Sequence, residues 1–440
     1  MQSSHSSNSA NNPAAERRLS TRVAVWILRV AVGGLFVMSG MVKAIDPWGF
    51  VFKLEDYLAA FGMAIPRSIV LTGAVLVCLY EFIFGLLLAT GCCRRVAPWA
   101  LTVMQAVMLP LTAYIAIANP VSDCGCFGDF WVISKTATFV KKKFIQAVAA
   151  LVFLIVKGAA VGKPLFRAPI QWLVEIIAAL YLIGVSLVGY NMQPLVDFRP
   201  FAPGKELVKT DDETDDIKFI YEKDGNRETF DAYSLPGNDW TYVDRIEPAA
   251  ATHSHSLHIL DEDGDDITAD VLPAEGKLLI CVIPEPGRAD ISYTYFLNEL
   301  HAAADSSGIA MMALLGTGRK GIERWKDVSM ASYPCYSAED TELKELSRGI
   351  MSLVLVNDGH VVAKATLSSL VGDGSEEDPM AVTERLANDD SRGFFFRATG
   401  IVAGILVLIY LFQGLLLAAR DIVRRKWRAH HRTATAKNES

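Results

Sequence analysis

The chain has 440 residues, of which 51% are apolar, and it carries a formal net charge of −7. The charge is unevenly divided, because residues 195–393 hold 39 acidic and 18 basic side chains while the rest of the chain holds 10 acidic and 24 basic ones. The basic residues gather at the ends of apolar runs and near the C-terminus, where lipid headgroups are sufficient partners. This distribution excludes a nucleic-acid-binding protein, and the length allows two or three domains.

Six apolar runs predict membrane-spanning helices, since a helix needs roughly 20 apolar residues to cross a bilayer. They are Arg22–Met41, Ile69–Cys93, Ala97–Ala118, Phe144–Val161, Ile170–Tyr190 and Thr399–Ala419. The fourth run is the shortest. No small-x-small cleavage site follows the first run, so we expect a retained helix there and not a signal peptide.

Basic clusters predict the orientation, because Lys and Arg mark the cytoplasmic ends of membrane helices. Clusters precede the first run and follow the second and fourth, and the chain ends in RDIVRRKWRAHHRTATAKNES. Their members include Arg17, Arg18, Arg22, Arg94, Arg95, Lys163 and Arg167. Six spans with cytoplasmic termini place the acidic region outside, in the periplasm if the membrane is a bacterial inner membrane. The cluster Lys141–Lys143 opposes this assignment, because it would also lie outside.

The short sequence DCGCFGD contains Cys124 and Cys126, which the topology places on the outer, oxidising side. A turn at Gly125 is needed to bring the thiols within bonding distance, and the resulting small ring would be strained and readily exchanged. Redox exchange is the favoured interpretation. Inert thiols are the second, and a metal site is the third, because zinc needs four ligands and no histidine lies nearby.

Two segments resemble known membrane proteins. RVAVGGLFVMSGMVKAIDPWGF resembles the opening helix of the DoxX-like family, and DCGCFGD resembles the Cys-x-Cys-Phe-Gly signature of the methylamine-utilisation protein MauE; together the likeness covers about Arg22–Tyr190. The resemblance implies a role in handling disulfides outside the membrane, with Cys124 and Cys126 as the matched residues. It links the chain to methylamine utilisation, although nothing in the sequence identifies the substrate.

Glu81 lies near the middle of the second apolar run. A carboxylate at that depth is costly and usually faces a partner or a polar cavity. It is a candidate proton relay or quinone-headgroup contact, with Lys43 able to reach toward it. The alternative is a buried interhelical hydrogen bond made by a protonated glutamate.

The acidic region alternates strand and helix patterns. KLLICVIPE and IAMMALLG predict buried strands, and ISYTYFLNELHAAADSSG, GIERWKDVSM and DTELKELSRG predict helices. MSLVLVNDGHVVAKA predicts a hairpin that turns at Asp358-Gly359. This order resembles a thioredoxin fold over about Leu272–Leu370. The dithiol of that family is missing, because PEPGRAD follows the first strand, so we expect a degenerate domain used for docking or structure.

Other groups in the acidic region are weaker candidates. Cys281 is expected in a strand and Cys335 in a loop, either as buried free thiols or joined by a disulfide. His253, His255 and His258 are candidate metal ligands, but their spacing equally fits a strand face. DEDGDDITADVL lacks the glycine and glutamate of a calcium loop and is expected to form an acidic hairpin turn. We expect no bound metal.

The predicted architecture is thus a polytopic α-helical membrane bundle plus an α/β thioredoxin-like extracytoplasmic domain. Residues 1–20 form a disordered cytoplasmic tail, 21–191 the membrane domain with about five helices, 192–392 the periplasmic domain, 393–420 the final transmembrane helix and 421–440 a basic cytoplasmic tail.

The predicted function is that of a membrane component of an extracytoplasmic thiol–disulfide system. Cys124 and Cys126 would exchange disulfides with a periplasmic partner protein, which would make the chain a thiol–disulfide oxidoreductase. One alternative is a non-catalytic assembly factor that binds a client through the periplasmic domain. Another is a quinone-linked oxidoreductase subunit, because subunits of thiosulfate:quinone oxidoreductase resemble DoxX.

Overall fold

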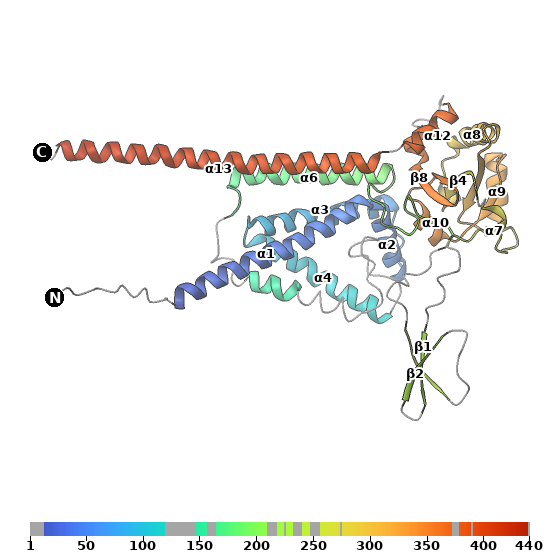
Figure 1. The fold of residues 1–440 in the computed structure, drawn as a ribbon, viewed down its shortest axis with the longest axis horizontal. Coiled ribbons are helices and arrows are strands. Elements are labelled where there is room, and N and C mark those ends of the chain that lie inside the picture. Colours follow the sequence, from blue (N-terminus) through green and yellow to red (C-terminus); the bar gives the residue numbers. More distant parts are fainter. Residues whose placement is uncertain are drawn as a thin grey trace. The chain divides into compact units, whose positions relative to one another are not determined.

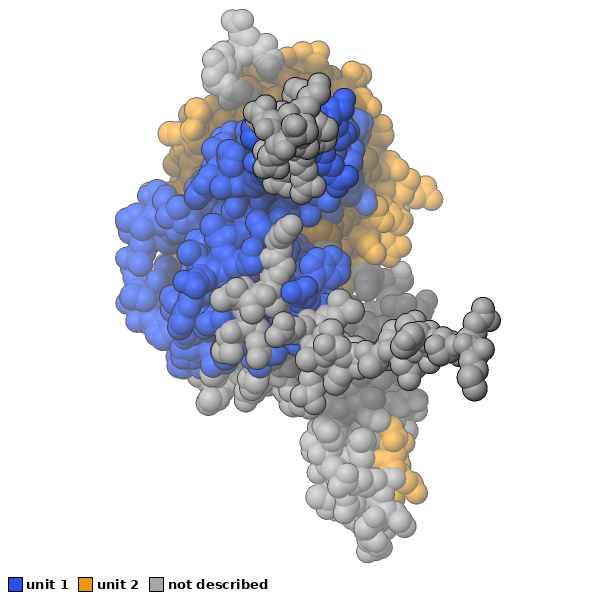
Figure 2. Space-filling model, turned by 90° about the vertical axis from the view of Figure 1, so that its left-hand side faces the viewer, with its two compact units in different colours: residues 1–190, 194–196, 390–440 blue, residues 191–193, 197–389 orange. Residues whose placement is uncertain are grey.

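The computed structural model describes residues 13–118, 147–155, 164–208, 218–223, 226–231, 240–246, 256–272, 275–371, 378–388 and 390–438 (Figure 1). The chain divides into two compact units, coloured separately in Figure 2. Unit 1 comprises residues 1–190, 194–196 and 390–440, and unit 2 comprises residues 191–193 and 197–389.

Unit 1 is built from long apolar helices. They are α1 (Pro13–Ile45), α2 (Pro47–Ala60), α3 (Arg67–Thr90), α4 (Val96–Ala118), α6 (Ala168–Asn191, whose last residue belongs to unit 2) and α13 (Ser391–Asn438). Residues 147–155 are also helical. Local signals set the boundaries: the Asp46 side chain caps α2 by accepting the Gly49 N–H at 2.9 Å, and α3 ends at Gly91, which has a left-handed φ of 72°.

Four of the described helices are long and apolar enough to cross a membrane. These are residues Ser20–Ile45, Arg67–Thr90, Ala168–Asn191 and Ser391–Trp427. They match the first, second, fifth and sixth predicted spans by length and composition. For α4, the described apolar part Val96–Leu111 is shorter, and only residues 147–155 of the fourth predicted span are described.

Glycines allow α1 and α3 to pack backbone against backbone. A Cβ atom added to Gly40 would lie 2.7 Å from the carbonyl oxygen of Cys78, and one added to Gly33 would lie 2.6 Å from that of Gly85. Small residues at a helix crossing are the usual means of close approach in membranes. The same crossing brings the polar residues of the two helices together. On the other side of the unit, α13 runs alongside α6 (Figure 1), and their hydroxyls Tyr181 Oη and Thr399 Oγ1 are 2.6 Å apart.

Unit 2 contains a five-stranded mixed sheet in the order β6-β5-β4-β7-β8. The strands are β4 (Lys277–Ile283), β5 (Ala310–Leu315), β6 (Cys335–Ser337), β7 (Ser352–Asn357) and β8 (His360–Thr366). Strands β4, β5 and β6 are parallel, and β7 is antiparallel to both β4 and β8. The predicted hairpin is confirmed, since Asp358 and Gly359 have φ values of 49° and 76° in its turn.

The central strand β4 is buried on both faces, so the sheet separates two cores. Leu279, Cys281 and Ile283 pack on one face with α8 (Thr294–Ser306), α9 (Arg319–Ser329) and α12 (Pro379–Ala387). Leu278, Ile280 and Val282 pack on the other face with α10 (Asp340–Leu346). The short elements α7 (Thr268–Val271), η4 (Pro286–Arg288), η5 (Ile291–Tyr293) and α11 (Leu367–Val371) complete the sheet domain.

The predicted strands and helices of the sheet domain are present, with two corrections. Cys335 begins strand β6, so the loop expected at that position is wrong. Helix α8 begins at Thr294, after the two short turns η4 and η5, and not at Ile291, where the predicted helix starts.

A second, three-stranded antiparallel sheet was not predicted. It has the order β2-β1-β3 and consists of β1 (Lys218–Lys223), β2 (Asn226–Asp231) and β3 (Thr241–Ile246). Its strands are rich in charged and polar residues, which hides them from a search for apolar runs.

Candidate functional site

The predicted redox pair, Cys124 and Cys126, lies outside the described residues. The same is true of Lys141–Lys143, His253 and His255. The exchange chemistry assigned to the pair therefore stays a prediction, and the described polar groups and thiols are the remaining candidates.

Glu81 and Lys43 form an ion pair inside the α1–α3 crossing. Lys43 Nζ lies 2.6 Å from Glu81 Oε2 and 2.8 Å from Oε1, and Ser39 Oγ donates to Oε2 at 2.8 Å. Lys43 and Glu81 are each 5% exposed. Lys43 also donates to Ser39 Oγ at 2.9 Å, so three polar side chains are mutually satisfied.

The crossing explains why these groups meet. Ser39 and Lys43 are four residues apart on α1 and therefore share one face, which Gly40 holds close to α3. The ring of Phe50 lies 5.3 Å from Lys43 Nζ and screens the pair. Two opposite charges in contact avoid much of the cost of burying either one alone. Sequence reasoning located the carboxylate and named Lys43 as able to reach toward it, and the structure places the two in contact.

The ion pair with Lys43 limits the roles that Glu81 can have while the pair is closed. Both of its carboxylate oxygens accept hydrogen bonds from α1. A proton-relay or quinone-contact role stays a prediction, and it would require this pair to open.

The thiols of unit 1 that the structure describes are free. Cys78 and Cys92 are buried and Cys93 is exposed. Cys92 Sγ faces the carbonyl of Phe166 at 4.0 Å, and the side-chain amide of Gln171 donates to Cys93 Sγ at 3.7 Å.

Cys281 and Cys335 in unit 2 are also free and buried. Cys281 pairs with Ala313 across β4 and β5, and Ala313 pairs with Cys335 across β5 and β6. Because neighbouring strands are about 4.8 Å apart, the two cysteines are about 10 Å apart, beyond the roughly 7 Å limit for a disulfide. The buried-thiol interpretation is confirmed, and the disulfide between them is wrong.

Burial also makes these two thiols poor nucleophiles. It raises the pKa of Cys281 far above its usual range, with the neighbouring Cys335 adding to the effect. Burial raises the pKa of Cys335 to about 11. Since the thiolate is the reactive form, neither residue is suited to exchange near neutral pH.

The other candidate ligands of the acidic region make protein contacts. His258 Nδ1 lies 2.7 Å from a carboxylate oxygen of Glu342. Asp261 accepts the N–H groups of Asp263 and Asp265, and Leu260 bridges to Asp266 across the expected hairpin turn. Among the described residues, no group of three His, Cys, Asp or Glu side chains is arranged to hold a metal.

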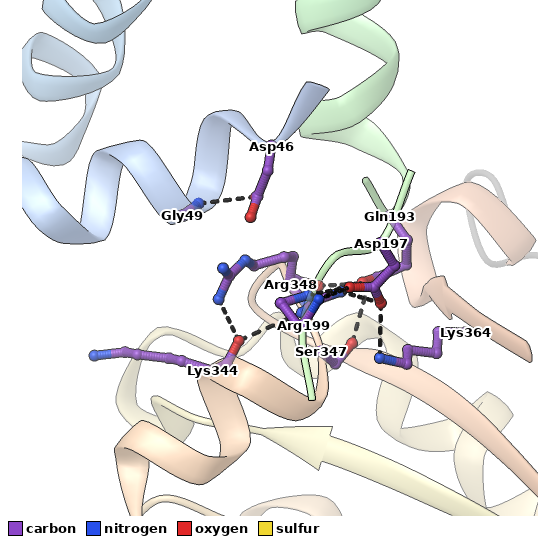
Figure 3. Close-up of polar contacts among 9 residues, drawn as sticks. All are labelled: Asp46, Gly49, Gln193, Asp197, Arg199, Lys344, Ser347, Arg348 and Lys364. Carbon is purple, nitrogen blue, oxygen red and sulfur yellow. Dashed lines mark hydrogen bonds and ion pairs between the residues drawn. The ribbon is translucent and has the colours of Figure 1, made fainter. Parts of the chain in front are cut away.

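A buried polar cluster, missed by sequence reasoning, ties residues 193–199 to the sheet of unit 2 (Figure 3). Asp197 bonds Arg199 Nε at 2.8 Å and Lys364 Nζ at 2.9 Å. The Gln193 amide donates to the carbonyl of Arg348 at 2.7 Å and accepts its N–H at 3.0 Å. Burial raises the pKa of Asp197, but the charges of Arg199 and Lys364 outweigh it and hold that pKa well below its usual range.

Part of unit 1 is similar to a known protein family. Residues 21–163 match the family model of methylamine utilisation protein MauE. These residues are similar to MauE. The match includes α1, α3 and α4, the Lys43–Glu81 pair and the Cys124-Gly-Cys126 sequence. It ends before α6 and unit 2.

A second family model, for a domain of unknown function (DUF8463), matches residues 216–248, which contain the three-stranded sheet. No curated protein and no solved structure matches the chain.

Proposed function

We propose that this MauE-type protein is the membrane component of an extracytoplasmic thiol–disulfide system linked to methylamine utilisation. In this proposal Cys124 and Cys126 exchange disulfides with a partner protein. The observation that carries it is the MauE match over residues 21–163, which includes both cysteines in the sequence DCGCFGD.

The exchange is a balanced two-electron reaction. The thiolate of one cysteine attacks a sulfur of the partner disulfide, forming a mixed disulfide and releasing one partner thiolate, which takes up a proton. The second cysteine then attacks the mixed disulfide, so that the pair becomes oxidised and the partner leaves with two thiols. In the reverse direction the same steps oxidise the partner.

We further propose that unit 2 has a degenerate thioredoxin-like fold and serves to dock a partner. The strand order β6-β5-β4-β7-β8, with helix α8 connecting β4 to β5, supports this fold. The segment after β4 contains no cysteine, and both thiols of the unit are buried. These features favour docking over catalysis by the unit itself.

The proposal places the cysteine pair and unit 2 on the periplasmic side of a bacterial inner membrane, with both termini in the cytoplasm. The basic residues near the inner helix ends support this orientation. A membrane-impermeant maleimide should then label reduced Cys124 or Cys126 in intact cells and leave Cys93 unlabelled until the membrane is opened. Labelling of Cys93 alone in intact cells would reverse the orientation.

Trapping a partner tests the chemistry. If one cysteine attacks and the other resolves, then Cys124→Ser or Cys126→Ser should accumulate a mixed disulfide that a reductant releases. Cys93→Ser, an exposed thiol outside the pair, is the matched control and should trap nothing. If neither single variant traps a partner and both keep wild-type function in cells, the proposal fails.

A non-catalytic assembly factor is the second candidate, and the buried thiols of unit 2 favour it. It would need the membrane helices only as an anchor. The double variant Cys124→Ser/Cys126→Ser separates the two functions, because an anchor tolerates it and an exchange enzyme does not.

A further inference from the structure

Glu175 on α6 is the second carboxyl group, besides Glu81, that is buried in the described membrane helices. It is 5% exposed, and neither of its carboxylate oxygens has a hydrogen-bond partner in the part of the chain that the structure describes. Helix α6 begins at Ala168, so Glu175 lies about 10 Å along the helix axis and inside the apolar run. It follows the residues that match the MauE model.

The surroundings of the two carboxyl groups differ. Glu81 is equally buried, but Lys43 and Ser39 donate to it at 2.6 and 2.8 Å, which stabilises its ionised form. Arg94 and Arg95 lie in the turn between α3 and α4, and neither is bonded to Glu175. An ionised carboxylate without a partner is costly in apolar surroundings, whereas a protonated carboxyl is neutral. The burial of Glu175 therefore favours its protonated form.

A pocket of about 370 Å³ reaches the same face of α6. Its walls include Ala168 and Gln171 of α6, together with Arg94 and Arg95. A pocket of this size with polar walls can hold water. Gln171 and Glu175 are four residues apart, so they share the buried face of α6 and are separated by about 6 Å along its axis. Gln171 thus connects the wall of the pocket to the helix turn that carries Glu175.

We propose that Glu175 is a proton-binding site of the membrane region, which exchanges its proton with water through the pocket that Gln171 lines. The amide of Gln171 both donates and accepts hydrogen bonds, so it can position a water molecule between the pocket and the carboxyl group. The proposal does not depend on disulfide exchange. It gives the role of proton carrier, which was expected of Glu81, to a carboxyl group that has no ion pair to open.

Infrared spectroscopy of the full-length protein in detergent tests the protonation. A protonated carboxyl group has a C=O stretching band that is separate from the bands of carboxylates and amides. We expect this band in the wild type and its loss in Glu175→Gln, which keeps the size of the side chain. Asp421→Asn, which removes an exposed carboxylate from α13, is the matched control and should keep the band.

The same band tests the route of the proton. After rapid transfer into D₂O it should move to lower frequency, because deuterium replaces the proton of the carboxyl group. In Gln171→Leu, which cannot hydrogen-bond to water, this change should be several-fold slower than in the wild type.

A hydrophobic carbodiimide provides a measurement on the wild type that needs no variant to fold. It enters apolar regions and reacts with protonated carboxyl groups, and peptide mass spectrometry locates the stable adduct. The adduct should form at Glu175 and not at Glu81, which Lys43 keeps ionised.

Three results would overturn the proposal. If Glu175→Gln removes no band and no adduct forms at Glu175, the carboxyl group is ionised and a cation pairs with it. If the band is present but does not move in D₂O, Glu175 is a sealed structural acid. If Gln171→Leu exchanges as fast as the wild type, the proton does not pass by Gln171.

Discussion

Lys43 and Glu81 neutralise each other between two apolar helices, so neither can be removed alone without leaving a buried charge. We expect Glu81→Leu or Lys43→Met to lower the free energy of unfolding by about 3–5 kcal/mol. The double variant should recover most of this loss, because both charges are then absent. Thermal unfolding of the four proteins in detergent measures the coupling between the two sites.

The same variants separate structure from function. If the double variant is stable and still exchanges disulfides, the pair is structural. If it is stable but inactive, Glu81 has a role in the reaction, as a proton relay would require. Equal losses in both single variants and in the double variant would contradict the ion pair itself.

Lys364 gives unit 2 a pH-dependent stability. Burial and the charge of Arg199 lower the pKa of Lys364 to about 7, although Asp197 raises it. The folded pKa is therefore below that of the unfolded chain, so the unfolded state binds more protons between pH 7 and 10.5. Stability contributed by this group is present at high pH and is lost as the pH falls toward the folded pKa.

We expect the free energy of unfolding of unit 2 to rise with pH across this range, by up to about 1.4 kcal/mol per pH unit, and to rise less in Lys364→Met. Denaturant unfolding at several pH values measures the difference between the two slopes. Lys320→Met, at an exposed position on α9, is the control. Parallel pH profiles for the wild type and Lys364→Met would contradict the assignment.

At the scale of elements, the sequence predicted what a local pattern encodes. Four spans follow from continuous apolar runs, and β4 and the β7–β8 hairpin follow from a buried run and the Asp358-Gly359 turn. Strand β6 has only three residues, and Pro334 before Cys335 favoured a loop. What makes it a strand is pairing with β5, which depends on the tertiary fold and leaves no local pattern.

The polar sites also divide into features that a local sequence pattern predicts and features that depend on the tertiary fold. Glu81 was recognised from its depth in an apolar run and Lys43 from its place at the end of the first run, but their contact depends on how Gly40 and Gly33 let two helices cross. Arg29 was not singled out, because a charge near the start of a span resembles the ordinary basic flank of a membrane helix. Arg29 is nevertheless only 8% exposed, because the turn at Gly91 lies against its guanidinium.

Residues 191–193 and 197–199 belong to unit 2, although they follow directly after a membrane helix. Gln193 bonds the backbone of Arg348 on both sides of its amide, and Asp197 supplies the carboxylate for two buried cations. A fragment of the acidic domain that begins after this segment would leave Lys364 and its neighbours without Asp197. Fragments intended to fold should therefore begin at Asn191.

At the scale of the whole molecule, the chain joins a membrane region that is similar to MauE over residues 21–163 to an acidic unit that the match does not include. The division of charge follows this boundary, because the acidic side chains are concentrated in residues 195–393. We expect disulfide exchange to be divided at the same boundary. If exchange belongs to Cys124 and Cys126, then unit 2 should contribute binding without redox activity.

We therefore expect the fragment 191–389 to show no reductase activity toward a protein disulfide. An active dithiol needs a cysteine of low pKa at a helix N-terminus, whereas α8 begins with Thr294 and burial raises the pKa of Cys335 to about 11. At neutral pH only on the order of one Cys335 in 10⁴ would be thiolate. Turbidity of reduced insulin measures the activity, and Cys281→Ala/Cys335→Ala is the control. Activity in the fragment that this double variant abolishes would move the reactive site into unit 2, because those are its only two cysteines.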